Sequence, residues 1–176
     1  GFSGDDGRTS ICDYTTMPKH QNWMSKGKFD GSDFTEEQKR LHNFYKKLLN
    51  FRLDSDAINK GAFYDLMWVN PWHSNFDPQY VYAFLRYHEE ERLLVVINFN
   101  QNESRYCEVK ISEDALEYMN LKISTDNRQQ TADDRSQQKI ATDIFTGEKI
   151  EYNLNEISTC GIALNLEPCG IKILKL

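Results

Sequence analysis

An amphipathic helix over residues 35–53 is the clearest element predicted by the pattern of apolar and polar positions. Its apolar residues follow the i, i+3, i+4, i+7, i+8 spacing of a helix with one apolar face: Leu41, Phe44, Tyr45, Leu48 and Leu49. Thr35 is a typical N-cap residue, and Gln38 stands three positions later, where it can complete a capping box. Most basic residues of the segment fall on the opposite face, so the apolar stripe needs a partner elsewhere.

From residue 62 onward the pattern changes to the two-residue period of β-strands. Residues 93–97 are apolar on both faces, as in a central strand, whereas Cys107, Val109 and Ile111 alternate with other residues to give one wet face. His88–Glu91 and Thr146-Gly147 are typical hairpin turns, and Glu167-Pro168 suggests a third near the C-terminus. The predicted strands cover residues 62–69, 80–87, 92–99, 105–111, 139–145, 149–153, 161–166 and 170–175.

These elements predict a mainly β fold, an antiparallel β-sandwich preceded by a long loop and one helix. Residues 1–34 read as the loop because they hold several glycines, Pro18 and many polar residues. Residues 112–119 allow one or two helical turns, and the nearly wholly polar residues 124–138 read as a loop. We divide the chain into residues 1–58 and a sandwich over residues 59–176.

The stretch Asn50–Ile58, NFRLDSDAI, admits two interpretations. An Arg-x-Asp behind an aromatic residue is one way in which a glycosidase strand presents a nucleophilic carboxylate. However, Arg52 continues the helical period from Leu48, and Lys46-Lys47 stand where a buried strand would need apolar residues. We therefore interpret Asp54 as the end of the helix and expect no catalytic role for it.

Composition supports a packed core and excludes several classes of partner. Apolar residues make up 39% and aromatic residues 12% of the 176-residue chain. No apolar run approaches the roughly 18 residues of a membrane span, so we expect no membrane partner. The formal net charge is −6 and no run of lysines and arginines occurs, which argues against nucleic acid.

Cysteine and histidine spacing predicts neither a disulfide framework nor a metal centre. The four cysteines are too few for a disulfide scaffold, and no C-x-x-C pair occurs. Cys160 and Cys169 would not lie opposite each other in the last predicted hairpin, so we expect no disulfide between them. We expect no metal and no cofactor. The residues considered are Cys12, Cys107, Cys160, Cys169, His20, His42, His73 and His88.

The order of segments resembles the C-terminal end of the α-amylase family, glycoside hydrolase family 13. The resemblance rests on GDDGRTSICDY, a Trp, GKFDG, the helix TEEQKRLHNFYKKLLNFR, and a sandwich ending in GIALNLEPCGIKILKL. It implies that residues 1–34 follow the eighth strand of a (β/α)8 barrel and residues 35–53 form its eighth helix. Residues 62–176 would then be the Greek-key sandwich called domain C.

The resemblance also implies that no catalytic residue lies in this chain. The family uses three carboxylates with a retaining mechanism, and all three would lie upstream of Gly1. FRLD at residues 51–54 imitates the nucleophile motif, but Asn50 replaces the family's preceding Gly. The parent enzyme would act on α-glucosidic linkages, and the chain alone would be inactive.

Aromatic side chains are the candidate sugar contacts. Because barrel active sites lie among the βα loops, Tyr14 and Trp23 are candidate substrate-binding residues in the intact enzyme. Packing against barrel helices is the alternative for both. Trp68, Trp72 and Tyr80 could form a surface sugar platform, with packing again the alternative. Arg8 and Asp13 are interpreted as a local salt bridge.

Two other function classes stay open at the level of sequence. The chain could be a stand-alone carbohydrate-binding β-sandwich, or, more weakly, an interaction domain of adhesin or immunoglobulin type, although the immunoglobulin Cys…Trp…Cys spacing is missing. The expected partners are the rest of the barrel, α-glucan in the intact enzyme, and a second copy of the chain through the exposed helix stripe. The sequence predicts no cell compartment.

Overall fold

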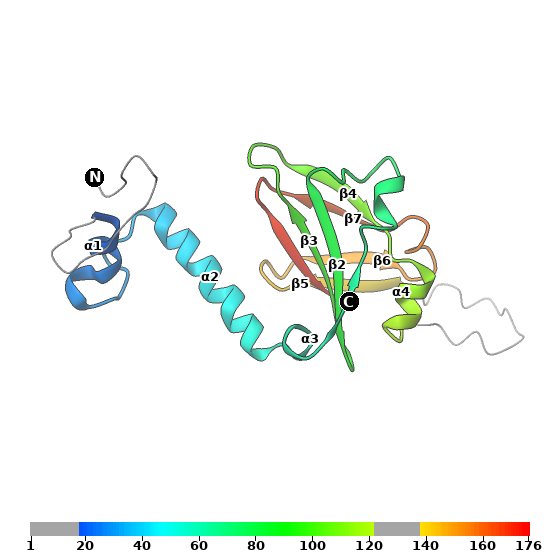
Figure 1. The fold of residues 1–176 in the computed structure, drawn as a ribbon, viewed down its shortest axis with the longest axis horizontal. Coiled ribbons are helices and arrows are strands. Elements are labelled where there is room, and N and C mark those ends of the chain that lie inside the picture. The colour runs from blue at the N-terminus through cyan, green and yellow to red at the C-terminus, as the bar shows by residue number, and fades with distance from the viewer. Residues whose placement is uncertain (1–17, 122–137) are drawn as a thin grey trace, which may run out of the picture. The chain divides into compact units, whose positions relative to one another are not determined.

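The computed structural model describes residues 18–121 and 138–176 and divides the chain into two compact units, Gly1–Asn50 and Phe51–Leu176. The described part of the first unit holds helix α1 (Pro18–Met24), a 3-10 turn η1 (Ser25–Gly27) and most of helix α2 (Glu36–Asp54). The boundary between the units falls within α2, whose last turn belongs to the second unit. Figure 1 shows the order of these elements along the chain.

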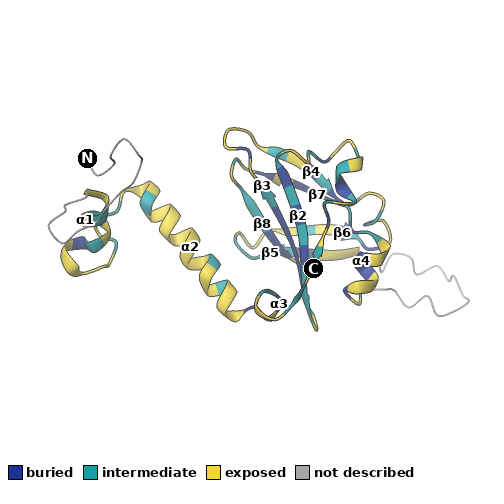
Figure 2. Cartoon of the chain, in the orientation of Figure 1, coloured by how far each residue is buried: buried dark blue, intermediate teal, exposed yellow. Residues whose placement is uncertain are grey.

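Helix α2 confirms the predicted amphipathic helix and its cap. The Thr35 Oγ1 atom accepts from the Gln38 backbone N–H (3.2 Å), and the Gln38 side-chain oxygen accepts from the Thr35 N–H (2.9 Å). This reciprocal pair is the capping box expected from the sequence. The helix ends at Asp54, as predicted, and no residue of α2 is buried. Figure 2 shows most of this helix in the exposed colour.

The second unit is mainly β and consists of two antiparallel sheets, which confirms the predicted fold class. The six-stranded sheet has the order β1-β2-β3-β8-β5-β6, and the two-stranded sheet pairs β4 with β7. The strand bounds are β1 (Ala62–Asp65), β2 (Val81–His88), β3 (Glu91–Asn98), β4 (Arg105–Val109), β5 (Gln138–Asp143), β6 (Lys149–Asn153), β7 (Ile162–Leu166) and β8 (Ile171–Lys175). Figure 1 shows β5 and β6 running across the direction of β2 and β3.

The core lies between the sheets and is closed by helix α4 (Glu113–Tyr118), within the segment predicted as one or two helical turns. Strand β3 pairs on both sides, with β2 and β8, as expected of a central strand. Burying each large apolar side chain stabilises the fold by roughly 1.5–3 kcal/mol. The core side chains include Ala83, Leu85, Leu94, Val96, Cys107, Val109, Leu116, Met119, Ala141, Tyr152, Ile162, Leu164 and Leu174.

The outer face of the six-stranded sheet, opposite the core, is also apolar. Strand residues alternate between faces, so Phe84, Val95 and Ile173, which are register partners across β2, β3 and β8, all point away from the core. Leu93 and Ile97 of β3 share this face. A short helix α3 (Asp56–Asn59) contributes there, because the Arg86 guanidinium on β2 donates to the carbonyl oxygens of Ala57 (3.0 Å) and Ile58 (2.7 Å).

Two predictions about local structure were wrong. Residues 18–27 are helical rather than loop, because Pro18 suits a first helical turn and the Trp23 ring packs edge-on against Phe29. Strand β1 ends at Asp65, and Asn70–Trp72 forms a 3-10 turn η2 with Pro71 in its first turn. The segment predicted at residues 124–138 lies almost wholly outside the described residues.

The predicted C-terminal hairpin was also wrong. Strands β7 and β8 belong to different sheets, so Glu167–Gly170 carries the chain from one sheet to the other. The crossing is held by the Cys169 N–H, which donates to the Asn100 carbonyl oxygen (2.9 Å), and by the Asn98 side chain, which donates to the Glu167 carbonyl oxygen (3.0 Å). Cys107, Cys160 and Cys169 are free thiols, and Cys12 lies outside the described residues.

Candidate functional site

Of the predicted sugar-contacting residues in the first unit, only Trp23 lies among the described residues. Tyr14, together with the predicted pair Arg8 and Asp13, lies outside them. Trp23 sits on α1, is half exposed, and stacks on His20 with ring centroids 5.8 Å apart. The ring is therefore partly used in local packing, and its other surface is accessible.

The structure brings Trp68 and Trp72 together in the segment between β1 and β2. The Trp72 indole N–H donates to the Trp68 carbonyl oxygen (3.0 Å), which fixes the orientation of the Trp72 ring. The exposed fraction is 54% for Trp68 and 85% for Trp72. Tyr64 flanks the pair, its ring centroid 6.3 Å from that of Trp68. We call Trp68 and Trp72 the tryptophan pair.

A fully buried asparagine holds the segment that carries the tryptophan pair. The Asn70 amide nitrogen donates to the carbonyl oxygens of Leu66 (3.1 Å) and Lys110 (3.0 Å), and its oxygen accepts from the Lys110 N–H (2.8 Å). His73 Nε2 lies 3.2 Å from the same oxygen and is therefore the protonated nitrogen. Burial, followed by the charge of Lys110, lowers the pKa of His73 and favours the neutral ring.

A hydrogen bond to a carboxylate lies next to the tryptophan pair. The Tyr64 hydroxyl donates to the Asp114 carboxylate at the start of α4. Burial raises the pKa of Tyr64 and this hydrogen bond adds to the shift, while the nearby Ser112 hydroxyl and then the hydrogen bond from Tyr64 lower the pKa of Asp114. The carboxylate thus stays ionised and ties strand β1 to α4.

Tyr80, the third predicted platform residue, lines a separate depression. This depression has a volume of about 470 Å³ and lies between the residue before β2 and the β3–β4 loop. The guanidinium of Arg105 lies over the Tyr80 ring, 5.1 Å from its centroid. We call this the Tyr80 depression; its lining residues are Tyr80, Phe99, Asn100, Gln101, Asn102, Glu103 and Arg105.

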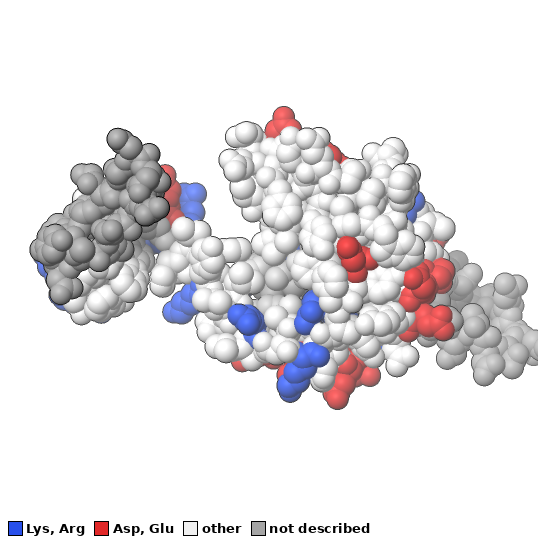
Figure 3. Space-filling model, viewed as in Figure 1, with Lys and Arg blue, Asp and Glu red and all other residues white. Residues whose placement is uncertain are grey.

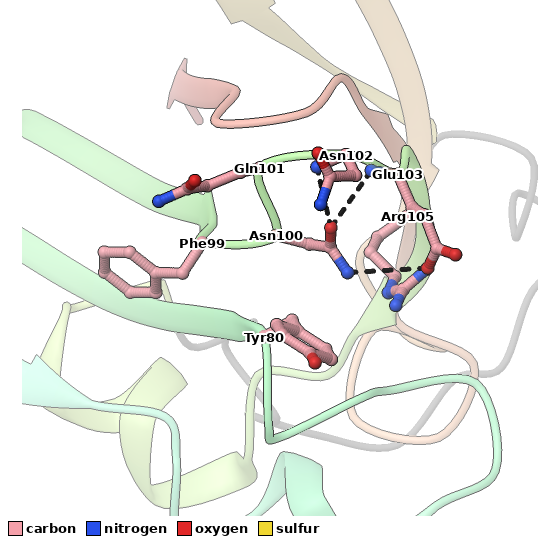
Figure 4. A pocket seen from close by; sticks show the side chains of 7 residues that line it. All are labelled: Tyr80, Phe99, Asn100, Gln101, Asn102, Glu103 and Arg105. Carbon is pink, nitrogen blue, oxygen red and sulfur yellow. Dashed lines mark hydrogen bonds and ion pairs between the residues drawn. The ribbon is translucent and has the colours of Figure 1, made fainter.

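Figure 4 shows two sides of the Tyr80 depression. Phe99 and Gln101 project to one side, and Asn100, Glu103 and Arg105 turn toward one another on the other, with the Tyr80 ring below them. Phe99 is 61% exposed. This loop was not predicted as a site from the sequence. Its signal is the run Asn98-Phe99-Asn100-Gln101-Asn102, rich in amides and directly following the apolar residues 93–97.

A second depression, of about 380 Å³, is acidic and includes Asp54, the last residue of α2. Two of its carboxylates, Glu91 and Asp56, have structural roles. Glu91 accepts from the Ser55 hydroxyl (2.9 Å) and the Ala57 N–H (2.7 Å), and Asp56 pairs with Lys60 (3.0 Å). Its lining residues are Asp54, Asp56, His88, Glu89, Glu90, Glu91 and Lys175, none of them aromatic apart from the imidazole of His88.

Neither depression provides a metal centre. Across residues 18–121 and 138–176, no group of three or more His, Cys, Asp or Glu side chains is arranged to hold a metal ion. In the same residues, no helix combines the length and apolar character needed to span a bilayer. Figure 3 shows acidic and basic side chains near one another toward one edge of the sandwich, with a wide neutral area above them.

Comparison with known proteins identifies the family of the sandwich. A model of the α-amylase C-terminal all-β domain matches residues 72–165, more than half of the chain. The chain belongs to this family. The resemblance to the C-terminal part of an α-amylase family enzyme is thereby confirmed, and the matched residues lie within the second unit, which holds the two antiparallel sheets.

Solved structures agree with the assignment of the fold. AmyP in complex with maltose is 15% identical, with a TM-score of 0.54 over 84% of this chain and 23% of that protein. A variant of AmyP in complex with maltotriose is 13% identical, with a TM-score of 0.50 over 82% of this chain and 22% of that protein. This chain thus spans less than a quarter of the length of these structures. A comparison with curated proteins gave no match.

Proposed function

We propose that this chain is the non-catalytic C-terminal part of an α-amylase-like glycoside hydrolase that acts on α-glucosidic linkages of starch-type glucans by a retaining mechanism. Residues 1–58 are the end of the catalytic barrel, and residues 59–176 are domain C. The role of domain C is to stabilise that barrel. The catalytic carboxylates belong to the preceding part of the enzyme.

The observation that carries this proposal is the apolar outer face of the six-stranded sheet. An antiparallel sheet commonly packs one face on its core and exposes the other to water. Here Leu93, Val95 and Ile173 are already buried within the chain, whereas Phe63 is 48% exposed on the same face and contacts the half-buried Phe84. A second apolar face is favourable where another body covers it, and the helical surface of a barrel is such a body.

The state of the acidic depression supports a non-catalytic role. A retaining glycosidase needs two carboxyl groups about 5–5.5 Å apart on either side of the scissile bond. In this depression Glu91 caps α3 and Asp56 is paired with Lys60. Asp54 closes α2 beside them, with no tryptophan or tyrosine in the lining on which a sugar ring could stack. We infer that these carboxylates stabilise the connection between α2, α3 and β3.

An activity assay tests the non-catalytic role. The purified chain is incubated with maltoheptaose, and the products are separated by chromatography. We expect no shorter maltooligosaccharides above the level of a boiled control. Turnover that Asp54→Asn abolishes would overturn the proposal, because it would place a working carboxylate within this chain.

A stability measurement on the complete enzyme tests the role of the outer face. Phe63→Asp replaces a side chain that is 48% exposed on this face; it should lower the melting temperature of the barrel and leave the KM for substrate unchanged, because the residue lies outside the active site. Tyr106→Asp is the matched control: it also replaces an aromatic residue, one that is exposed on strand β4 of the other sheet. Equal effects of both variants would contradict barrel docking through the outer face.

Carbohydrate binding by the sandwich itself is the second candidate function. The exposure of the tryptophan pair favours it, because an indole ring fixed by its own N–H can stack on a sugar face at little cost in entropy. Titration of the chain with maltoheptaose, followed by tryptophan fluorescence, tests this. Binding that is lost in Trp72→Ala supports the tryptophan pair, whereas an unchanged spectrum up to millimolar sugar counts against it.

A further inference from the structure

We propose that the Tyr80 depression is a second glucan-binding site, distinct from the tryptophan pair, which accommodates one or two glucose units of a neutral α-glucan. This inference rests on the proposed function for its choice of sugar, and on the geometry of the depression for everything else. Its volume of about 470 Å³ falls within the range of roughly 300–1,000 Å³ typical of small-molecule sites.

The loop that forms the depression is held by buried amides. The Asn98 side chain donates to the carbonyl oxygens of Glu103 (2.9 Å) and Glu167 (3.0 Å) and accepts from the Asn100 N–H (2.9 Å). The Asn100 side-chain oxygen accepts from the backbone N–H groups of Asn102 (2.9 Å) and Glu103 (3.0 Å). A loop fixed in this way presents its side chains without a large cost of ordering on binding.

The loop is also anchored to its neighbours on both sides. The Phe99 N–H donates to the Tyr80 carbonyl oxygen (2.8 Å), which ties the loop to the start of β2. The Cys169 N–H donates to the Asn100 carbonyl oxygen (2.9 Å), which ties it to the crossing between β7 and β8. The depression is therefore lined by two segments, Tyr80 and the loop after β3, and this loop is anchored to a third segment, as suits a preformed site.

The charges in the depression favour a neutral ligand over an anion. Arg105 is the only basic residue in its lining, and its Nη1 atom pairs with Glu103 (2.7 Å) while its Nε atom lies 3.3 Å from the Asp77 carboxylate. Two carboxylates thus oppose one guanidinium, so a phosphate or sulfate would be repelled. A hydroxylated neutral ligand can use the same groups, because each OH both donates and accepts.

The remaining side chains suit a sugar in particular. The exposed Phe99 ring offers an apolar face for the C–H groups of a pyranose, and Gln101 beside it offers an amide (Figure 4). The Asn100 amide nitrogen has a single long contact within the described residues, to Glu103 Oε2 (3.4 Å), so it can donate to a hydroxyl. One ring surface with several planar hydrogen-bonding groups around it is the chemistry that binds pyranose hydroxyls.

The test is a titration of the ¹⁵N-labelled chain with maltotriose, followed by NMR. We expect amide shifts at residues 99–105 and a dissociation constant that rises roughly tenfold in Phe99→Ala, as loss of an aromatic contact predicts. Gln101→Ala should weaken binding less. Trp72→Ala is the control, which removes an exposed ring from the tryptophan pair and should leave the shifts at residues 99–105 unchanged. Cellotriose, whose linkages are β, should shift these amides less than maltotriose.

The other outcomes are decisive as well. Shifts confined to residues 64–73 and lost in Trp72→Ala would overturn the inference and support the tryptophan pair. If no amide shifts at about 20 mM maltotriose, where even a millimolar dissociation constant would be detected, both sugar sites are overturned. The barrel-supporting role of the domain would be unaffected. Equal binding of cellotriose would overturn the assignment to α-glucan. Cleavage of maltotriose during the titration would instead contradict the proposed function.

Discussion

At the scale of single residues, buried asparagines decide how the long connections of this domain are placed. Asn70 and Asn98 are almost completely inaccessible to solvent, and each side chain makes three hydrogen bonds with backbone groups, at least one of them to a segment distant in sequence. Each side chain satisfies carbonyl and N–H groups that a strand ladder would otherwise pair. Removing one therefore leaves several buried polar groups without partners.

We expect Asn70→Leu to destabilise the protein by about 2–4 kcal/mol. Leucine has a similar branched shape but no hydrogen-bonding groups, so the Lys110 carbonyl oxygen and N–H lose these hydrogen bonds, while the Leu66 carbonyl oxygen keeps only its backbone donors. Urea unfolding measures the loss. Asn155→Leu is the control, because Asn155 is exposed and should change stability by less than about 0.5 kcal/mol. A loss as small as that of the control would show that the connection is held by other contacts.

The buried thiol of Cys107 makes stability fall at alkaline pH. Burial raises the pKa of this thiol from 9.0 to about 12, and the charge of Glu108 adds to the effect. The folded state thus keeps a proton that the unfolded state releases, so this contribution is complete below pH 9 and is lost as the pH rises from 9 toward 12. In Cys107→Val, the loss of stability between pH 8 and 10.5, measured by urea unfolding, should be smaller than in the wild type. Parallel pH profiles would contradict this.

At the scale of elements, repeating patterns were predictable from the sequence and single connections were not. Seven of the eight strands were predicted close to their observed bounds and β1 was predicted too long; alternation along residues such as 93–97 and 162–166 reflects burial on one or both faces. The same holds for α2 with its capping box. Alternation does not reveal which strand pairs with which. Glu167-Pro168 therefore suggested a hairpin, whereas Asn98 and Asn100 direct the chain to the other sheet.

The candidate sites show the same limit. The exposed tryptophan pair could be suggested from Trp68 and Trp72, because a spacing of four residues in a turn-rich segment places two rings close together. The Tyr80 depression could not, because it joins the residue before β2 to the loop after β3 and to Arg105. Helix α1 was missed for another reason: at seven residues it has too few positions to display a helical period.

The capping box of α2 makes a prediction for this element. Thr35→Ala removes the hydrogen bond to the Gln38 N–H, and we expect it to destabilise the first turn of α2 by about 1 kcal/mol. Amide hydrogen exchange at residues 36–40 should accelerate about fivefold, the equivalent of that energy. Thr35→Ser is the matched control and should exchange like the wild type, because it keeps the oxygen. Unchanged exchange in Thr35→Ala would show that the cap does not limit opening of this turn.

At the scale of the whole molecule, two surfaces leave large apolar side chains only partly covered within the described residues, each in its own unit. One is the outer face of the six-stranded sheet, where Phe63, Tyr82 and Phe84 form a row of ring contacts. The other is the stripe of α2, where Leu41 is 59% exposed. Solvation of such surfaces is unfavourable, and the proposed barrel would cover both. Without the barrel, the isolated chain must cover these apolar side chains in another way.

We therefore propose that the isolated chain forms a homodimer through the stripe of α2. Burying each leucine of the stripe is worth roughly 1.5–3 kcal/mol, and two copies can present the same stripe to each other in a two-fold arrangement. Analytical ultracentrifugation should show a concentration-dependent dimer for the wild type. Leu41→Gln/Leu49→Gln should be monomeric at the same concentrations, because glutamine keeps helix propensity and removes the apolar side chains.

A matched substitution on the other apolar surface separates the two candidates for the dimer interface. Phe63→Gln alters the outer sheet face and leaves α2 unchanged, so it should dimerise like the wild type. If Phe63→Gln abolishes association and the doubly substituted helix does not, then the sheet face is the dimer interface. A wild-type chain that stays monomeric at high micromolar concentration, with α2 amides slow to exchange, would contradict the proposal outright. It would mean that the stripe is stable in contact with water or is covered by the chain itself.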